Sequence, residues 1–286
     1  RFRVSVILDM IGFSINLVLI LWLVRGPDDA WLGLLSLLIS AVLCQVSAHV
    51  IVLRSLKLQA LRFQGGLKLL RECTALFAHR GFGILMVSST TYLASLVTSE
   101  THVGLYGAAD RVAGVGLGLL EPASQVLVGT VARHLGTVGS QGEAYSLMRK
   151  GFALMFGFGL LMLAGTHLLA GTFLPLLMGP QFTEAVPILK ILAFSFPLVA
   201  LCQVVTGFVL IPLRMDSVVS TVSLVIAPAS VVLILVLGHS YEGIGVAWAR
   251  SLTYVLLTFV LFEVMRRKQL LGRIFPRKPV EALGDA

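Results

Sequence analysis

The 286-residue chain is 57% hydrophobic and only 13% charged, and its mean hydropathy is +0.94. Soluble domains carry about 25% charged residues because their surfaces face water, so the composition excludes a water-soluble globule and indicates an integral membrane protein. The net charge of +8 does not indicate nucleic-acid binding, because the cations lie in the connections between apolar runs.

The apolar runs predict an all-α integral membrane protein. A helix needs about 20 apolar residues to cross the hydrocarbon core, and its backbone must be hydrogen-bonded internally there. On that scale the sequence predicts eight transmembrane helices, with both chain ends on the same side. Their ranges are residues 4–24, 31–53, 75–99, 103–131, 149–171, 187–211, 217–238 and 243–265.

The charges of the connections predict the orientation of these helices. Cations concentrate before the first helix, between the second and third, between the fourth and fifth, and after the last. The connections between these are acidic or nearly neutral: "GPDDA", "SETH", "GPQFTE" and "HSYEG". By the positive-inside rule, the N-terminal edge and the C-terminal tail are both expected to be cytoplasmic.

The connection between the second and third predicted helices interleaves leucines with cations, in "RSLKLQALRFQGGLKLLRE". This pattern fits a short helix lying on anionic lipid headgroups, and it fits an ordinary basic loop equally well. The three cysteines are widely separated and have no CxxC spacing, so we expect neither a disulfide nor a metal site.

The fourth predicted helix carries charged and small residues inside an apolar run. At 100° per residue, one narrow sector of it collects Gly107, Gly114, Gly118, Glu121 and Gln125, with Asp110 and Arg111 on its flanks. A charge at the bilayer centre costs about 2.5–3.5 kcal/mol, so such groups face a cavity or a partner. We expect Glu121 to face a water-filled cavity. The alternative is that Asp110 pairs with Arg111 and the glycines only permit close packing.

Further polar residues lie inside other predicted helices. Arg80 and Arg250 belong to the third and eighth, and Asp9 and Asn16 share a face of the first. Guanidinium groups suit phosphate oxygens and stay charged at any working pH, so a cavity with Arg80, Arg111 and Arg250 would suit an anionic substrate. The alternative is that these arginines snorkel to the nearer interface.

Motifs for catalysis are absent from the sequence. It contains no GxxxxGK[ST], HExxH or GxSxG pattern, and its expected outer loops are very short. We therefore expect no enzyme activity and no cofactor.

Three stretches of the sequence resemble bacterial polysaccharide flippases of the O-antigen type. They are "HVGLYGAADRV…GLLEPASQVLVGTVARHLG", "LLMGPQFTEAVPILKILAFSFPLVALCQVVTGFVLIPLRMDS" and "GIGVAWARSLTYVLLTFVLF". The resemblance implies membership of the multidrug/oligosaccharidyl-lipid/polysaccharide exporter superfamily, whose fold is two six-helix lobes around a cavity that opens alternately to each side. One departure is "GTVARHLG", where that family often has a proline.

The resemblance also implies a domain organisation. Residues 1–53 would be the last two helices of the N-terminal lobe, 54–72 a cytoplasmic connection, 73–265 the six-helix C-terminal lobe and 266–286 a basic cytoplasmic tail. On this alignment the chain holds helices five to twelve, with about four helices missing before residue 1.

The implied function is translocation of undecaprenyl-pyrophosphate-linked oligosaccharide across the bacterial cytoplasmic (inner) membrane for surface polysaccharide synthesis. Arg80, Arg111 and Arg250 would attract the pyrophosphate or acidic sugars, and Glu121, Gln125 and Asn16 would hydrogen-bond sugar hydroxyls. Glu121 or Asp9 would carry a coupling ion. Membrane lipid is an expected partner, as are a polysaccharide polymerase and chain-length machinery.

Three alternatives remain open at this stage. A cation-coupled multidrug antiporter would share the fold but favour a cavity dominated by carboxylates, which Asp9 and Glu121 leave possible. A peptidoglycan-precursor flippase would share both fold and chemistry. A membrane-embedded glycan polymerase or ligase would need a large outer loop, which the sequence does not contain.

Overall fold

The computed structural model describes residues 2–26, 29–55, 89–120, 128–131, 133–134, 141–213 and 215–275. All regular structure among these residues is helical. The chain divides into two compact units, Arg1–Lys68 and Leu69–Ala286. Each unit is described by itself.

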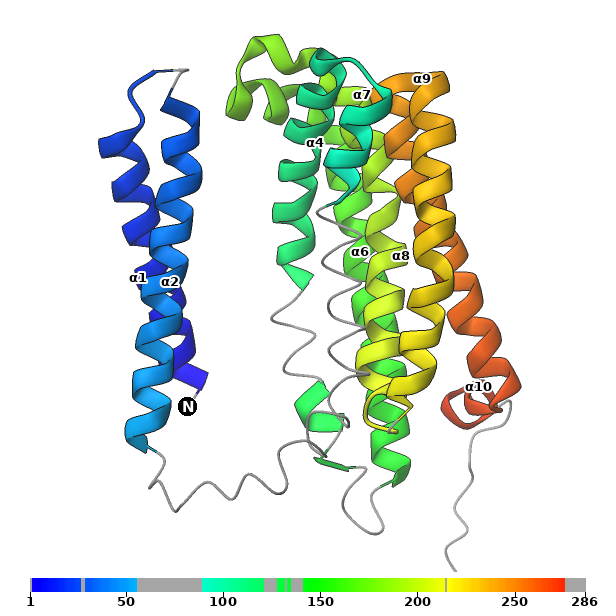
Figure 1. Ribbon diagram of the computed structural model, residues 1–286. Coiled ribbons are helices and arrows are strands. Elements are labelled where there is room, and N and C mark those ends of the chain that lie inside the picture. Colours follow the sequence, from blue (N-terminus) through cyan, green and yellow to red (C-terminus); the bar gives the residue numbers. More distant parts are fainter. Residues whose placement is uncertain are drawn as a thin grey trace, which may run out of the picture. The chain divides into compact units, whose positions relative to one another are not determined.

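The first unit contains a pair of helices, α1 (Phe2–Leu23) and α2 (Ala30–Ser55), which lie side by side (Figure 1). Small residues let them approach closely, because a Cβ built on Gly12 of α1 would collide with the Cys44 sulfur of α2. A polar contact also joins them: the Ser36 hydroxyl lies 3.0 Å from the Asn16 side-chain oxygen and donates to it.

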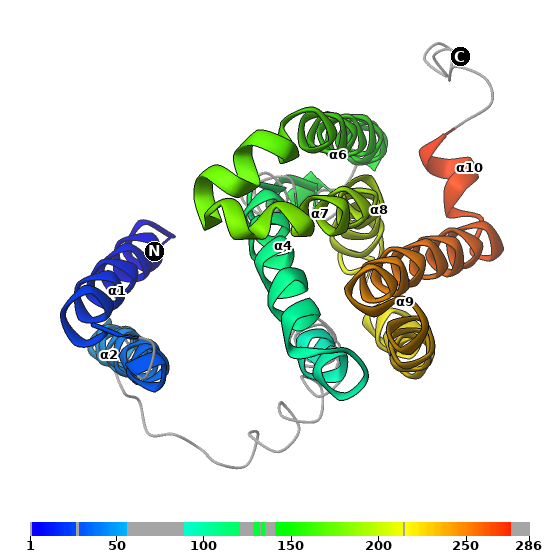
Figure 2. The ribbon, with the colours of Figure 1, turned by 90° about the horizontal axis from the view of Figure 1, so that it is seen from above.

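The second unit is a bundle of helices. Its labelled elements are α4 (Glu100–Gly118), α6 (Gln141–Met178), the 3₁₀ helix η3 (Pro180–Ala185), α7 (Val186–Ala193), α8 (Ser195–Gln203), the π-helix η4 (Val204–Leu210), α9 (Asp216–Arg267) and α10 (Leu270–Ile274). Residues 89–97, which precede α4, are helical as well. Seen from above, α7 and α8 lie between α6 and α9 (Figure 2).

Helix α9 consists of two arms that run in opposite directions (Figure 1). A straight helix of 52 residues would be about 78 Å long, more than twice the hydrocarbon thickness of about 30 Å. The chain turns back at Glu242, whose φ of 51° and ψ of −136° are not helical. Gly238 in the first arm consequently lies against Val246 in the second.

Two buried hydrophobic clusters hold the second unit together. One joins α6, η4, α9 and α10, and includes Phe152, Phe208, Leu261 and Met265. The other joins α4, α6, η3, α7 and both arms of α9; its buried residues include Tyr106, Leu174, Ile188, Leu192, Phe196, Ile234 and Val246. The second cluster surrounds the candidate site described below.

Helices α6 and α8 approach each other at a glycine. A Cβ built on Gly159 of α6 would lie 2.7 Å from Pro197 Cα and 3.1 Å from the Phe196 carbonyl oxygen. Both are main-chain atoms of α8, which cannot rotate away as a side chain could. The absence of a side chain at residue 159 is therefore a condition for this packing.

Four helical segments in the described ranges are long and apolar enough to cross a membrane: Trp31–Ile51, Gly142–Met178, Pro180–Leu210 and Asp216–Arg267. A shorter apolar helix covers Met10–Leu23. Large apolar side chains are exposed along them, including Leu161, Leu168 and Leu176 on α6 and Val225, Val232 and Phe259 on α9. Lipid, rather than water, suits such a surface. The all-helical membrane class is thus supported, whereas the total of eight crossings stays a prediction.

Candidate functional site

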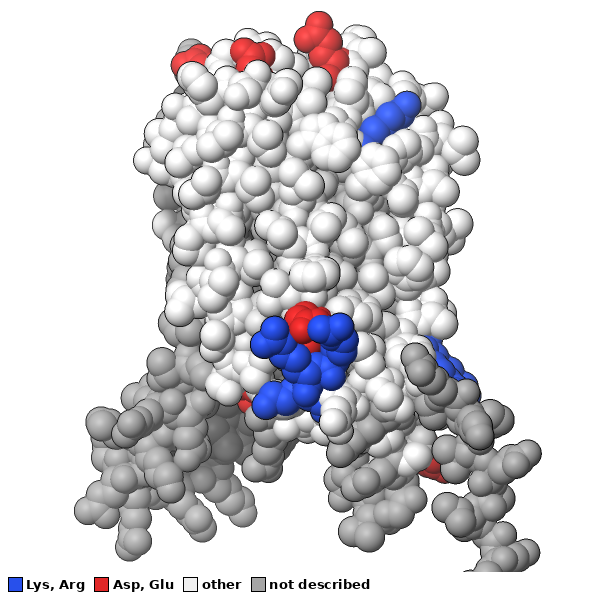
Figure 3. Space-filling model, turned by 90° about the vertical axis from the view of Figure 1, so that its right-hand side faces the viewer, with Lys and Arg blue, Asp and Glu red and all other residues white. Residues whose placement is uncertain are grey.

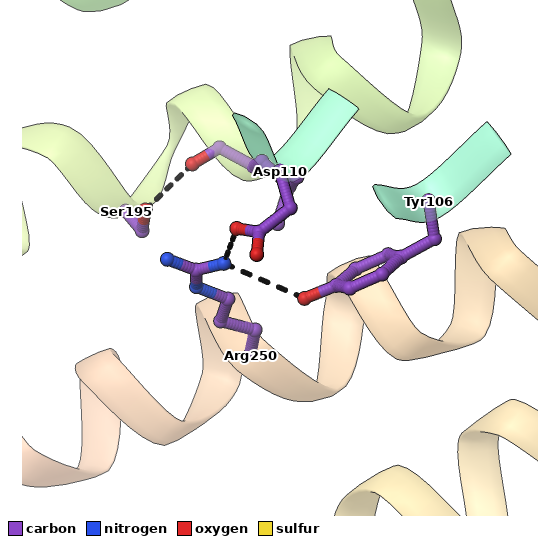
Figure 4. A network of polar contacts seen from close by, with 5 residues as sticks. Tyr106, Asp110, Ser195 and Arg250 are labelled. Atoms are coloured by element: carbon purple, nitrogen blue, oxygen red, sulfur yellow. Dashed lines mark hydrogen bonds and ion pairs between the residues drawn. The ribbon is translucent and has the colours of Figure 1, made fainter. Parts of the chain in front are cut away.

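An ion pair lies inside the second unit between α4 and the second arm of α9. Nη1 of the Arg250 guanidinium donates to the Asp110 carboxylate, and it lies 3.5 Å from the Tyr106 hydroxyl oxygen (Figure 4). The Arg250 side chain is only 8% exposed and that of Asp110 is 19% exposed. Tyr106 is completely buried.

The sequence places these groups on facing sides of their helices. Tyr106 and Asp110 are four residues apart on α4, and Arg250 and Tyr254 are four apart on α9. Residues with that spacing lie on one face of a helix, one turn apart. On each helix, a tyrosine and a charged residue therefore lie on the same face. The charged residue is acidic on α4 and basic on α9.

The ion pair lies well below one end of the bundle. Asp110 follows Glu100, the first residue of α4, by ten positions, and Arg250 follows Glu242 by eight. At a rise of about 1.5 Å per residue, these spacings correspond to depths of about 15 and 12 Å. A lone charge that deep in hydrocarbon is costly, and its partner removes most of that cost.

A second side-chain contact joins the same two helices at their upper ends. His102 of α4 contacts the Glu242 carboxylate at the reversal of α9. These residues are half-exposed, and they lie eight positions before Asp110 and Arg250 respectively. Because both pairs keep the same offset, α4 and the second arm of α9 run in parallel through this region.

Further polar contacts fix the second arm of α9 against its other neighbours. The Ser251 hydroxyl donates to the Ile191 carbonyl of α7 at 3.0 Å, and the Thr258 hydroxyl lies 3.3 Å from the Cys202 sulfur of α8. The Arg250 backbone is therefore held from two sides, so the position of its guanidinium is set by packing as well as by Asp110.

Arg111 lies on a different side of α4 from Asp110. Its side chain is exposed, and a Cβ built on Gly104, Gly107, Gly114 or Gly118 would meet no atom of the described residues within 4 Å. At 100° per residue these four glycines surround Arg111 on one face. Helix α4 thus has a packed face that includes Asp110 and an open, glycine-lined face that carries Arg111.

The predicted site residues are brought together only in part. Asp110 pairs with Arg250 rather than with Arg111, which lies on another face of α4. Asn16 is a residue of the first unit, where it accepts the hydrogen bond from Ser36. Arg80, Glu121 and Gln125 lie outside the described residues, as does the side chain of Asp9.

Sequence reasoning missed the partnership of Tyr106 and Asp110 with Arg250. The four-residue spacings on the two helices and the opposite charges were visible in the sequence. The spacings and charges do not show which helices are neighbours in the fold. Among the described residues, no group of three or more His, Cys, Asp or Glu side chains could hold a metal ion.

Charged side chains are segregated toward the two ends of the second unit. In the face shown in Figure 3, acidic groups and one cation lie toward the upper end, a broad uncharged band follows, and several cations gather around an acidic group below it. Arg266 and Arg267, in the last turn of α9, both contact Glu263. Such a band between two charged ends is typical of a membrane-embedded surface.

No protein-family model, curated protein or solved structure was found to match the chain. Its function is consequently argued from the composition, the fold and the contacts described above.

Proposed function

We propose that the protein is a flippase that moves undecaprenyl-pyrophosphate-linked oligosaccharide across the bacterial cytoplasmic membrane by alternating access. The substrate would serve surface polysaccharide synthesis (O-antigen, capsule or exopolysaccharide), in concert with a polymerase and chain-length machinery. The proposal rests on the resemblance of three sequence stretches and on one structural observation, the open face of α4.

The observation that carries most weight is the exposed Arg111 beside four glycines at which an added Cβ would meet no described residue within 4 Å. Arg111 follows Glu100 by eleven residues, which corresponds to a depth of about 16 Å from the end of α4. A guanidinium at that depth needs water or an anion, because hydrocarbon does not solvate it. A glycine-lined face leaves room for a bulky ligand beside it, which suits a pyrophosphate headgroup bearing sugars.

The remaining predicted residues take complementary roles in this proposal. Arg80 and Arg250 add positive charge for the pyrophosphate, while Glu121, Gln125 and Asn16 provide hydrogen-bond partners for sugar hydroxyls. The lipid tail stays in the bilayer between the two lobes. The cation-rich end of the second unit, with Arg149, Lys150, Arg266 and Arg267, faces the cytoplasm by the positive-inside rule, and so does the C-terminus.

Charge-neutralising variants test the role of Arg111. Arg111→Gln should reduce delivery of lipid-linked oligosaccharide at least tenfold in cells that lack their own flippase, at an unchanged level of protein in the membrane. Arg149→Gln is the matched control, because Arg149 is an exposed cation near the start of α6. Normal delivery by Arg111→Gln would remove the main structural support for the proposal.

A multidrug antiporter of the same superfamily is the second candidate, and Asp110 is the observation that favours it. A carboxylate inside the bundle could take up a cation once Arg250 moves away. Efflux of a cationic dye that depends on Asp110, together with unchanged oligosaccharide delivery, would select the antiporter. A peptidoglycan-precursor flippase would instead be required for viability.

A further inference from the structure

Three cations follow one another at the end of the second arm of α9. Arg266, Arg267 and Lys268 are all exposed, and the side chains of the two arginines are 73% and 78% exposed. The Glu263 carboxylate, one turn earlier, contacts both arginines. We call these four residues the α9 cation cluster. Because three positive charges face one negative charge, the cluster keeps an excess of positive charge at the surface.

Glu263 holds the two guanidinium groups side by side. One of its oxygens accepts from Arg266 Nη2 at 3.0 Å and from Arg267 Nε at 2.9 Å, and its other oxygen lies 2.8 Å from Arg266 Nε. Nη1 of Arg266 and both terminal nitrogens of Arg267 have no acceptor among the described residues. These remaining donors suit a phosphate, whose oxygens match guanidinium groups in geometry and charge.

The chain that follows the cluster holds it in place. Gln269, with a φ of 55°, lies between α9 and α10, and α10 packs back against α6 and α9. Leu270 and Ile274 of α10 are buried, and the Phe275 ring meets the Phe152 ring of α6 edge-on, with 5.5 Å between the centroids. The last turn of α9 is therefore supported by packing, so its cations have a defined position.

An exposed apolar stripe runs along α9 toward the cluster. Its members are large apolar residues that are at least 40% exposed, namely Trp248, Leu252, Val255 and Phe259. At 100° per residue they share one face of the helix with Arg266. Arg266 follows Phe259 by seven positions, which is about 10 Å along the helix.

The length of this arm places the cluster at the level of the lipid headgroups. Arg266 follows Glu242, where α9 turns back, by twenty-four positions. This spacing corresponds to about 36 Å, slightly more than the hydrocarbon thickness of about 30 Å. The apolar stripe thus lies beside acyl chains, and the cations lie beside phosphates.

We propose that the α9 cation cluster binds an anionic phospholipid, with the lipid phosphate on Arg266, Arg267 and Lys268 and an acyl chain along the stripe at Phe259. Charge selects this occupant. A zwitterionic phospholipid carries its own ammonium group, which the cluster repels, whereas an anionic headgroup brings only negative charge. The inference goes beyond the proposed transport function, because it concerns a lipid of the bilayer that stays on the surface of the second unit.

Quenching of tryptophan fluorescence by brominated lipids tests the proposal. In the full chain, Trp22, Trp31 and Trp248 are replaced by phenylalanine, and Phe259→Trp supplies a single reporter beside the expected acyl chain. The protein is reconstituted in phosphatidylcholine that contains brominated phosphatidylglycerol or, for comparison, brominated phosphatidylcholine. The affinity for phosphatidylglycerol should exceed that for phosphatidylcholine at least about threefold. Equal affinity of the two lipids at residue 259 would overturn the proposal.

Salt and variants locate the lipid at the cluster. The preference should disappear at about 1 M salt, which screens exposed charges, and this measurement needs no change to the cations. Arg266→Gln/Arg267→Gln should abolish the preference, whereas Arg149→Gln/Lys150→Gln, which removes two exposed cations of α6, should preserve it. An equal loss in both double variants would attribute the preference to overall charge and contradict the site.

A second reporter separates a site from general attraction to the protein surface. Val225 is 64% exposed on the first arm of α9, away from the cluster in sequence. Val225→Trp, in the same background without other tryptophans, should show equal affinities for the two lipids. A preference at residue 225 as strong as that at residue 259 would contradict a specific site.

The lipid-linked substrate is the competing occupant. Undecaprenyl pyrophosphate, added in an amount equal to the protein, should leave the quenching at residue 259 by brominated phosphatidylglycerol unchanged. Complete displacement would assign the cluster to that substrate and overturn the phospholipid assignment. The proposed function is tested separately, because the quenching requires no transport. A protein that delivers lipid-linked oligosaccharide but shows no lipid preference would reject the phospholipid site alone.

Discussion

Arg250 donates to Asp110 eight residues along both helices from the contact between Glu242 and His102. The two contacts connect α4 with the second arm of α9 in a common register, one pair half-exposed near the end of the bundle and the other largely buried. In the inner pair, the acidic Asp110 and the basic Arg250 lie at a similar depth in the bundle. The energetic consequences of that arrangement can be measured.

Removal of one member of the inner pair should cost more than removal of both. Asp110→Ala leaves the Arg250 charge without compensation, and we expect the free energy of unfolding to fall by about 2–3 kcal/mol. This value is at the low end for buried pairs because the Asp110 side chain is 19% exposed. The double variant Asp110→Asn/Arg250→Gln should lose less than about 1 kcal/mol.

A double-mutant cycle in detergent, with thermal or SDS-induced unfolding as the readout, measures this coupling. The corresponding cycle for Glu263 and Arg266 serves as a control, because that pair is exposed and should couple by less than about 1 kcal/mol. Additive effects of the Asp110 and Arg250 substitutions would show that the two side chains do not stabilise each other.

The close approach of α6 and α8 makes Gly159 sensitive to any side chain. Gly159→Ala would push a methyl group into the main chain at Pro197, so we expect a loss of about 1–3 kcal/mol in unfolding free energy. Gly165→Ala is the matched control on the same helix, since a Cβ there meets nothing within 4 Å. It should be neutral or stabilise by up to about 1 kcal/mol.

Thermal unfolding of the two purified variants gives the comparison directly. An equal effect of both substitutions would mean that α6 and α8 do not touch at Gly159.

The reversal of α9 places a glutamate in a backbone conformation that favours glycine. At φ 51° and ψ −136°, a side chain at residue 242 costs about 1–3 kcal/mol of backbone strain. Glu242→Gly relieves it and loses only a half-exposed contact with His102, worth less than about 1 kcal/mol. We therefore expect the variant to be more stable than the wild type.

His102→Ala separates the two contributions, because it removes the contact and keeps the strain. It should destabilise slightly. A Glu242→Gly protein that unfolds at a lower temperature than His102→Ala would show that residue 242 stores no such strain, because both variants lose the contact.

The packing of α1 against α2 predicts a specific disulfide. A Cβ built on Gly12 lies 3.7 Å from Cys44 Cβ, inside the range of about 3.5–4.5 Å that disulfides require. Gly12→Cys should therefore crosslink to Cys44 under mild oxidation, whereas Gly33→Cys, whose Cβ does not approach Cys44, should not. Mass spectrometry of the oxidised protein identifies the linked peptides. Equal crosslinking of both variants would contradict the α1–α2 register.

The all-helical membrane class follows directly from composition and apolar length. The turn at Glu242 was expected between two apolar runs, because "HSYEG" interrupts them with polar residues. The register between helices was not predictable, since an apolar face can pack equally well against several neighbours. Arg250 was therefore expected to face substrate, whereas its nearest partner is Asp110 of a helix that begins 150 residues before it.

The central claim is that the protein carries lipid-linked oligosaccharide from the cytoplasmic to the periplasmic side of the inner membrane. The most direct measurement uses the complete reading frame in cells that lack their own O-antigen-type flippase, and follows the oligosaccharide on each side of that membrane. We predict that delivery to the periplasmic side is restored. Persistent accumulation on the cytoplasmic side, with the protein present in the membrane and several donor sugars tested, would contradict the claim.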